Sequence, residues 1–266
     1  MTANALFGRF VGRESFVHAL DPRMKLTLTA ALFALVLCAF TPFALAVDAT
    51  FIIIAYGVAR ITPKEVAATL WPLLVLVIMT ALLNMVFVQG GTVYFQLGIL
   101  VVSEEGLLAA AFLGCRLLLL LLVAALLTLT TSTFAITEAL EAVMRPLTMV
   151  HVPVHELAMM MGIALRFLPQ FVAELAIIRR AQLSRAAELS FNPFKGGLST
   201  LAALIVPLFT SAFRHSETLA FAMDARCYHG GEGRTRLHPF AFTWRDGVAL
   251  AVIGSMTVCL VLADMW

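Results

Sequence analysis

Charged residues are scarce in this chain of 266 residues, and two short stretches contain no cation. Only 13% of the residues are charged and 61% are hydrophobic, whereas soluble domains carry about 25% charged and about 45–50% apolar residues. None of the 18 Lys and Arg residues falls within residues 41–50 or 88–105. A soluble globule of this length cannot bury so much apolar surface, so we expect lipid to cover part of it.

The sequence also lacks the residue patterns that bind metals, cofactors or nucleic acids. The four Cys share no metal-ligand or redox spacing, and the six His place no pair on one helix face. The net charge of +2 is small, and the basic residues are spread among apolar helices rather than gathered in a stripe. The glycine-rich residues 230–235 lack the Gly-Lys-Ser/Thr ending of a phosphate loop and a preceding strand. We therefore expect no bound cofactor, no metal, no nucleic acid and no catalytic site.

Long apolar runs predict an all-α polytopic membrane protein. About 20 apolar residues in a helix span the hydrocarbon of a bilayer. Five runs meet that requirement, at residues 26–41, 43–59, 66–89, 106–131 and 247–263. Thr62-Pro63-Lys64-Glu65 and Ser103-Glu104-Glu105 mark two helix starts with a capping hydroxyl and first-turn carboxylates. Residues 90–97, which begin with two glycines, suggest a hairpin or a surface loop.

The cations orient these runs, because cytoplasmic loops carry an excess of Lys and Arg. Four cations precede the first run and place the N-terminus in the cytosol: Arg9, Arg13, Arg23 and Lys25. The loops at 41–50 and 88–105 then lie outside, and residues 132–246, which hold 11 of the 18 cations, lie inside. We expect domains at 1–131, 132–246 and 247–266. A sixth span arises if residues 154–171 enter the bilayer.

The cytosolic segment divides into three predicted helices, at about 133–149, 153–188 and 197–228. Pro169 and Pro207 lie inside the two long helices and bend them. Each long helix ends in an Arg between two small residues, as Ser184-Arg185-Ala186 and Ala225-Arg226-Cys227. Small neighbours leave a guanidinium accessible, and its rigid fork suits carboxylates on a partner. Two such tips on one face predict a two-pronged docking surface; the alternative is a pair of solvated cations that complement the helix dipoles.

Several blocks, in order along nearly the whole chain, resemble the transmembrane (T) component of energy-coupling factor transporters, a branch of the ABC importers. The blocks are Leu20-Asp21-Pro22-Arg23-Met24-Lys25-Leu26, Val152-Pro153-Val154-His155-Glu156-Leu157-Ala158, Leu165-Arg166-Phe167-Leu168-Pro169, Pro207-Leu208-Phe209 and Ala222-Met223-Asp224-Ala225-Arg226. Residues 230–235, Gly-Gly-Glu-Gly-Arg-Thr, resemble the shared, housekeeping type more than the dedicated cobalt or nickel type.

The resemblance implies a role in energy coupling and the partners that this role needs. Two cytosolic ABC ATPases, which use ATP and Mg²⁺, dock on the coupling helices of a T component. A small membrane protein, the S component, binds the vitamin and leans on the T component. Nucleotide-driven movement then topples the S component and moves the substrate inward. The T component is a non-catalytic subunit in this scheme.

The docking motifs depart from the family at one position each. The family's Ala-Arg-Gly motifs map onto the two tips with both Arg present, but Ala186 and Cys227 replace the glycines. Glycine just past a helix allows a left-handed end, and another residue there costs about 1–2 kcal/mol. We therefore expect the helices to continue past the motifs, with the third helix ending nearer Gly230.

Other residues and functions leave alternatives open. Arg116, inside the fourth run, is a functional intramembrane charge or a structural cation paired with a carboxylate such as Glu156 or Glu174. The methionines at 159–161 are ordinary core or an adaptable surface for several S components. A stand-alone secondary transporter would need an intramembrane ionisable pair and inverted repeats, and an intramembrane enzyme would need a nucleophile–base pair or a metal cluster; the sequence shows neither.

Overall fold

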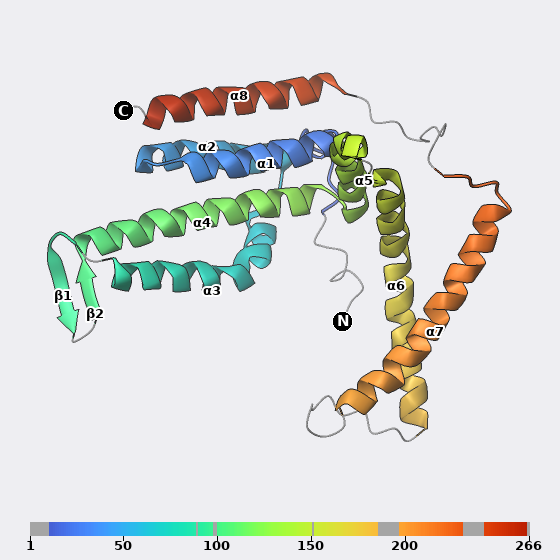
Figure 1. The fold of residues 1–266 in the computed structure, drawn as a ribbon. Helices are drawn as coiled ribbons and strands as arrows, with labels where there is room; N and C mark the ends of the chain where they lie inside the picture. Colours follow the sequence, from blue (N-terminus) through green and yellow to red (C-terminus); the bar gives the residue numbers. More distant parts are fainter. Residues whose placement is uncertain are drawn as a thin grey trace. The chain divides into compact units, whose positions relative to one another are not determined.

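The structure is a computed structural model that describes residues 11–88, 90–97, 100–150, 152–185, 197–230 and 242–264. The described residues are helical apart from one short β-hairpin, as the ribbon in Figure 1 shows. The chain forms two compact units, one of residues 1–143 with 239–266 and one of residues 144–238. The prediction of a helical polytopic fold is therefore confirmed.

The first unit is a bundle of helices. Its helices are α1 (Pro22–Cys38), α2 (Pro42–Ala59), α3 (Pro63–Phe87), α4 (Glu104–Thr130), α5 (Thr133–Met144) and α8 (Trp244–Asp264). Helices α1, α2, α4 and α8 pack against one another, and α3 runs beside α4. The hairpin of β1 (Val93–Leu97) and β2 (Leu100–Ser103) pairs Val93 with Ser103 and joins α3 to α4. Of the two alternatives that the sequence left open for residues 90–97, a hairpin or a surface loop, the structure shows the hairpin.

Local sequence signals set where these helices begin. A proline occupies the first position of α1, α2 and α3, where its missing N–H costs no hydrogen bond. Asp21 caps α1 by accepting from the Arg23 N–H at 2.9 Å, and the Glu65 carboxylate accepts from the Thr62 N–H at 2.8 Å. Ser103 Oγ accepts from the Gly106 N–H at 3.1 Å at the start of α4. Both helix starts predicted from capping patterns are confirmed.

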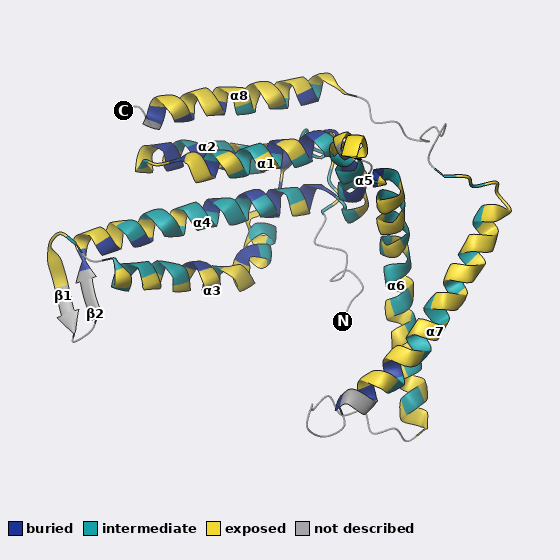
Figure 2. Ribbon diagram, in the orientation of Figure 1, coloured by how far each residue is buried: buried dark blue, intermediate teal, exposed yellow. Residues whose placement is uncertain are grey.

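Small and branched side chains form the core of the bundle. The buried cluster consists of Val36, Ala39, Ala44, Leu45, Ile52, Leu119, Val123, Leu260 and Ala263, contributed by α1, α2, α4 and α8 and by Ala39, which follows α1. Much of α8 and part of α3 are exposed, as Figure 2 shows, and large apolar side chains are among these exposed residues. On α3, for example, Trp71 is 74% and Phe87 is 78% exposed. Such surfaces suit lipid rather than water.

Five helices, α2, α3, α4, α6 and α8, are long and apolar enough to cross a membrane. This set differs from the five predicted runs, because it includes α6 (Val154–Ser184) and omits α1. Helix α1 has 17 residues, which is the lower end of the range that spans a bilayer. It packs with α2, α4 and α8 in the first unit. Whether the number of membrane spans is five or six therefore depends on α1 and α6.

The predicted segment 132–246 does not coincide with the second unit, which covers 144–238. Its first helix was expected at 133–149, but the α-helix ends at Met144 and continues as the 3-10 helix η2 (Arg145–Val150). Pro146 explains this end, because proline has no N–H and its ring clashes with the preceding turn. Helix α5 therefore belongs to the first unit, and α8 joins the same unit rather than forming a separate part.

Polar side chains tie together one end of the bundle. Asp246, only 1% exposed, accepts from the Asp21 N–H at 3.1 Å through Oδ1 and from the Thr243 N–H at 2.7 Å through Oδ2. Lys25, also buried, donates from Nζ to the carbonyl oxygens of His18 at 2.9 Å and Thr130 at 3.1 Å. The starts of α1 and α8 and the end of α4 are therefore joined at one point.

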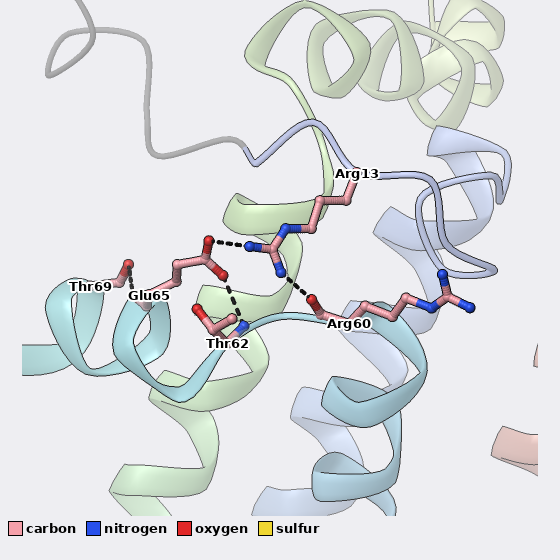
Figure 3. Close-up of polar contacts among 5 residues, drawn as sticks. All are labelled: Arg13, Arg60, Thr62, Glu65 and Thr69. Carbon is pink, nitrogen blue, oxygen red and sulfur yellow. Dashed lines mark hydrogen bonds and ion pairs between the residues drawn. The ribbon is translucent and has the colours of Figure 1, made fainter.

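A second polar contact joins the segment before α1 to the connection between α2 and α3. Arg13 donates to Glu65 Oε1 at 2.8 Å and to the carbonyl oxygen of Arg60, as Figure 3 shows. Arg60 has φ of 57°, a left-handed conformation that ends α2 abruptly. The same Glu65 therefore serves both as the capping residue of α3 and as the partner of Arg13.

Replacing Asp246 tests the junction between α1 and α8. We expect Asp246→Asn to destabilise the protein by about 1–3 kcal/mol, because an amide has one acceptor oxygen and leaves one of two buried N–H groups unpaired. Thermal unfolding in detergent measures the effect. Glu14→Gln, which neutralises an exposed carboxylate of the same unit, is the control; an equal midpoint for both variants would contradict the assigned role.

Candidate docking site

The second unit is built on two long helices, α6 (Val154–Ser184) and α7 (Gly197–Asp224). They run in opposite directions and cross, as Figure 1 shows. Near the crossing, Gln182 Nε2 donates to the Ala203 carbonyl oxygen at 3.2 Å. Few of the described side chains of either helix are buried. On α6 the buried residue is Val154, and examples on α7 are Thr200 and Leu204. Specific polar and aromatic contacts therefore fix this pair more than a packed apolar core does.

His215 of α7 is the centre of those contacts. Its ring lies 6.1 Å from the rings of both Phe167 and Phe171 of α6. Its Nε2 lies 3.6 Å from a carboxylate oxygen of Glu174 and 3.2 Å from the amide nitrogen of Gln170. Ser211 Oγ donates to the same Glu174 carboxylate. One α7 face thus meets one α6 face through a histidine, a carboxylate and two phenyl rings.

The first predicted tip lies at the C-terminal end of α6. Ser184 is the last helical residue, and Arg185 caps the helix with its N–H donating to the Gln182 carbonyl oxygen at 3.1 Å. Both side chains are exposed, and Arg185 forms no ion pair with any residue that the structure describes. Ala186, the third residue of the predicted motif, and the rest of the helix predicted to reach 188 lie outside the described residues.

The second predicted tip, Ala225-Arg226-Cys227, is a turn rather than a continuation of the helix. Helix α7 ends at Asp224, so the expectation that it would run on toward Gly230 is wrong. Cys227 adopts φ of 54°, its N–H donates to the Asp224 carbonyl oxygen at 2.9 Å, and the Tyr228 N–H donates to the Met223 carbonyl oxygen at 3.1 Å.

These two hydrogen bonds form a Schellman motif with Cys227 in its left-handed position. The motif satisfies carbonyl groups that the helix end would leave unpaired. That gain offsets the cost of about 1–2 kcal/mol for a residue other than glycine in this conformation. The backbone geometry that a glycine usually provides is therefore formed here by cysteine.

The two tips lie at opposite ends of the helix pair. Arg226 borders a hollow of about 610 Å³ whose lining includes Met159 and Ile163 near the start of α6 and Met223 near the end of α7. Arg185 follows Ile163 by 22 residues, which corresponds to about 33 Å along a helix. The two arginines are therefore separate exposed cations and not neighbours in one compact patch; whether both dock on a partner stays a prediction.

Large apolar side chains are exposed between these tips. Examples on α6 are Met160 (53%) and Met161 (46%), and examples on α7 are Phe209 (60%) and Phe213 (67%). In this chain the core interpretation is therefore wrong for Met160 and Met161, whereas the partly buried Met159 lines the hollow beside Arg226. Exposed apolar surface of this extent is typical of a partner or membrane contact.

Arg116 of α4 has a structural partner. It donates to the carbonyl oxygen of Ala39, which follows the end of α1, and its guanidinium lies 4.7 Å from the centre of the Phe112 ring. The sequence suggested a carboxylate partner, but a free carbonyl at a helix end serves the same purpose. Among the described residues, no group of three or more His, Cys, Asp and Glu side chains is arranged to hold a metal ion.

Substitutions of Cys227 test the turn at the end of α7. We expect Cys227→Gly to keep or strengthen the turn and Cys227→Val to weaken it by about 1–2 kcal/mol, because a β-branched residue is strained at positive φ. Hydrogen exchange of the amides at 227 and 228 measures the hydrogen-bonded turn directly. Cys227→Ala, expected to behave like the native residue, is the control, and faster exchange in the glycine variant than in the valine variant would contradict the assignment.

Comparisons with known proteins agree with this architecture. The family described as cobalt transport protein (CbiQ) matches residues 13–237. A Brevibacillus brevis protein is 40% identical over 266 residues, covering 100% of this chain and 99% of its own length. A Thermosediminibacter oceani protein is 39% identical over 253 residues (94% of each chain), and a Bacillus subtilis protein is 37% identical over 262 residues (98% of each chain). All three are named energy-coupling factor transporter transmembrane protein EcfT. The chain therefore belongs to the family of transmembrane T components of energy-coupling factor transporters.

Proposed function

We propose that this T component couples ATP hydrolysis by two cytosolic ABC ATPase subunits to movement of a vitamin-binding S component. The observation that carries the proposal is the separation of Arg185 and Arg226 at opposite ends of the α6–α7 pair. Arg185 lies about 33 Å along α6 from Ile163, which lines the hollow beside Arg226. Two separated cations suit two docking events, one on each ATPase, better than a single compact contact. The chain contains no Gly-Lys-Ser/Thr sequence of a phosphate loop, so in this proposal ATP and Mg²⁺ are used by the partners.

Each tip suits an acidic pocket on an ATPase. A guanidinium presents five donors in a plane and pairs with a carboxylate through two parallel hydrogen bonds. Arg185 and Arg226 are exposed and free of ion pairs with described residues, so docking breaks no ion pair with them. Rigid helix ends transmit displacement better than loops do. The hydrogen-bonded turn after Asp224 makes the backbone at Arg226 rigid in this sense.

The exposed apolar side chains of α6 and α7 suit the S component. Methionine side chains adapt to different partner surfaces because they have three flexible bonds and a polarisable sulfur. Met160 and Met161 on α6 meet this description, as expected for a T component of the shared type that accepts several S components. In this proposal the substrate is chosen by the S component and not by this chain.

The orientation follows from the distribution of cations. The N-terminal segment, the α2–α3 connection and the tips of α6 and α7 carry Arg or Lys and face the cytosol in this proposal. The connection between α1 and α2 and the β1–β2 hairpin carry no cation and face outward. The protein then lies in the cytoplasmic membrane of a bacterium or archaeon.

Replacing both arginines tests the docking assignment. We expect Arg185→Ala and Arg226→Ala each to weaken ATPase binding by roughly 2 kcal/mol or more, as for buried arginine anchors at interfaces. The double variant should lose vitamin uptake while still binding the S component. Lys at both positions should restore little, because an ammonium lacks the planar fork.

Co-purification of the ATPases and uptake of radiolabelled vitamin are the measurements. Arg214→Ala, which removes an exposed arginine from the middle of α7, is the matched control and should leave both unchanged. Normal uptake by the double variant would show that these residues do not couple the ATPases to transport.

Labelling of single cysteines tests the orientation. In a variant that keeps Cys227 and replaces Cys38, Cys115 and Cys259, we expect an impermeant maleimide added to intact cells not to react. A second variant that lacks all four native cysteines and carries Tyr94→Cys on the hairpin should react, because Tyr94 is 66% exposed on the proposed outer side. The reverse pattern would contradict the orientation, and labelling after lysis checks that Cys227 is reactive.

A further inference from the structure

An open apolar hollow lies in the first unit between α1, α2 and α8, close to the end of α4. Its volume is about 530 Å³, which is within the usual range of ligand sites. Its floor includes the buried Ile52 and Met256, and its rim includes Ile54, Val58 and Val252, which are 56%, 44% and 46% exposed. The hollow therefore opens on an exposed, apolar side of the bundle, which suits lipid.

The polar groups that line this hollow already have partners. Lys25 Nζ donates to two carbonyl oxygens, Thr29 Oγ1 donates to the Lys25 carbonyl oxygen at 2.6 Å, and Thr130 Oγ1 donates to the Leu126 carbonyl oxygen at 2.7 Å. The remaining lining residues are apolar. A hydrocarbon chain suits this hollow, because a polar ligand would lose its hydrogen bonds to water without replacement.

A second hollow, of about 930 Å³, adjoins the first and is lined by charged residues. The two share Phe16 and Val58 in their linings. Arg13, Arg60 and Arg245 line the second hollow, opposed by a single lining carboxylate, Glu14. Both hollows are in the first unit, so an apolar space and a cationic space lie next to each other at one end of the bundle.

Two of these arginines are available for a ligand. Arg13 is neutralised by Glu65, whereas the Arg60 guanidinium points away from Glu65, as Figure 3 shows. Neither Arg60 nor Arg245 forms an ion pair with a residue that the structure describes. Arg245 lies 5.9 Å from the ring centre of Trp244, a residue type common at membrane interfaces. Burial and then the charge of Lys25 lower the pKa of His18, which disfavours its charged form.

We propose that these adjoining hollows bind one anionic phospholipid, with its phosphate at Arg60 and Arg245 and an acyl chain between α2 and α8. Basic pockets between membrane helices on the cytoplasmic side recognise anionic headgroups in this way. The cytosolic orientation proposed above places the site in the inner leaflet. The bound lipid covers apolar side chains that α1, α2 and α8 leave open and holds the ends of α2 and α8 together, next to the Asp21–Asp246 contact.

Lipid titration of the purified full chain in detergent tests the site. Phosphatidylglycerol should raise the midpoint of thermal unfolding and remain bound as one molecule per chain in native mass spectrometry, whereas zwitterionic phosphatidylcholine should do neither. Glycerol phosphate, which has the headgroup charge without acyl chains, should not bind. Binding of glycerol phosphate alone would show an anion site and overturn the proposal, as would equal retention of both phospholipids.

Two pairs of variants test the headgroup site and the acyl-chain site separately. Arg60→Gln with Arg245→Gln should weaken phosphatidylglycerol binding at least tenfold, whereas Lys64→Gln, which removes an exposed cation just after Arg60 but outside both hollows, should not. Ala249→Phe should fill the apolar hollow and displace the lipid, whereas Ala251→Phe, on an exposed face of the same helix outside the hollow, should not.

The unfolding midpoint of each variant without lipid shows whether it is folded. Unchanged lipid binding in both folded test variants would overturn the proposal, and so would loss of binding in the controls to the same extent. Ala249→Phe that leaves lipid bound while the arginine variant loses it would place the acyl chain elsewhere and overturn the assignment of the apolar hollow.

Discussion

A chain in hydrocarbon must satisfy its backbone hydrogen bonds within its own helices, and its helix ends must find partners elsewhere. The first unit meets this constraint at one end of the bundle, where Asp246 accepts from two N–H groups and Lys25 donates to two carbonyl groups. Charges that are costly in an apolar bundle are therefore used to fix helix ends. Within the Asp-Pro-Arg-Met-Lys block at 21–25, Asp21 and Lys25 therefore have a structural role.

The second unit is held together differently from the first. Helices α6 and α7 bury few side chains against each other, and a cluster around His215 and Glu174 sets their crossing. Most of their apolar surface stays exposed, and burial of such surface is the main driving force for association. Exposed apolar surface of this kind suits a membrane or partner contact.

The ends of these two helices differ in what holds them. After α7, two main-chain hydrogen bonds lock Cys227 in a left-handed conformation and give Arg226 a defined direction. After α6, Arg185 caps the helix through its own N–H group. The two arginines therefore lie at opposite ends of the pair, on helix ends of different geometry.

The sequence by itself determined the helical class, the apolar runs and the starts of α3 and α4, because periodicity and capping act over a few residues. It left a hairpin or a surface loop open between α3 and α4. It also carried the motif blocks that gave the family resemblance. Only the tertiary structure decided that Asp21 meets Asp246, that Arg116 binds the Ala39 carbonyl, and that Arg185 and Arg226 are far apart. These relations join residues distant in the chain, and no local pattern encodes them. The predicted end of α7 is wrong for a related reason. The cost of about 1–2 kcal/mol for a residue other than glycine at positive φ is outweighed by two main-chain hydrogen bonds, and these form only when the backbone closes the turn.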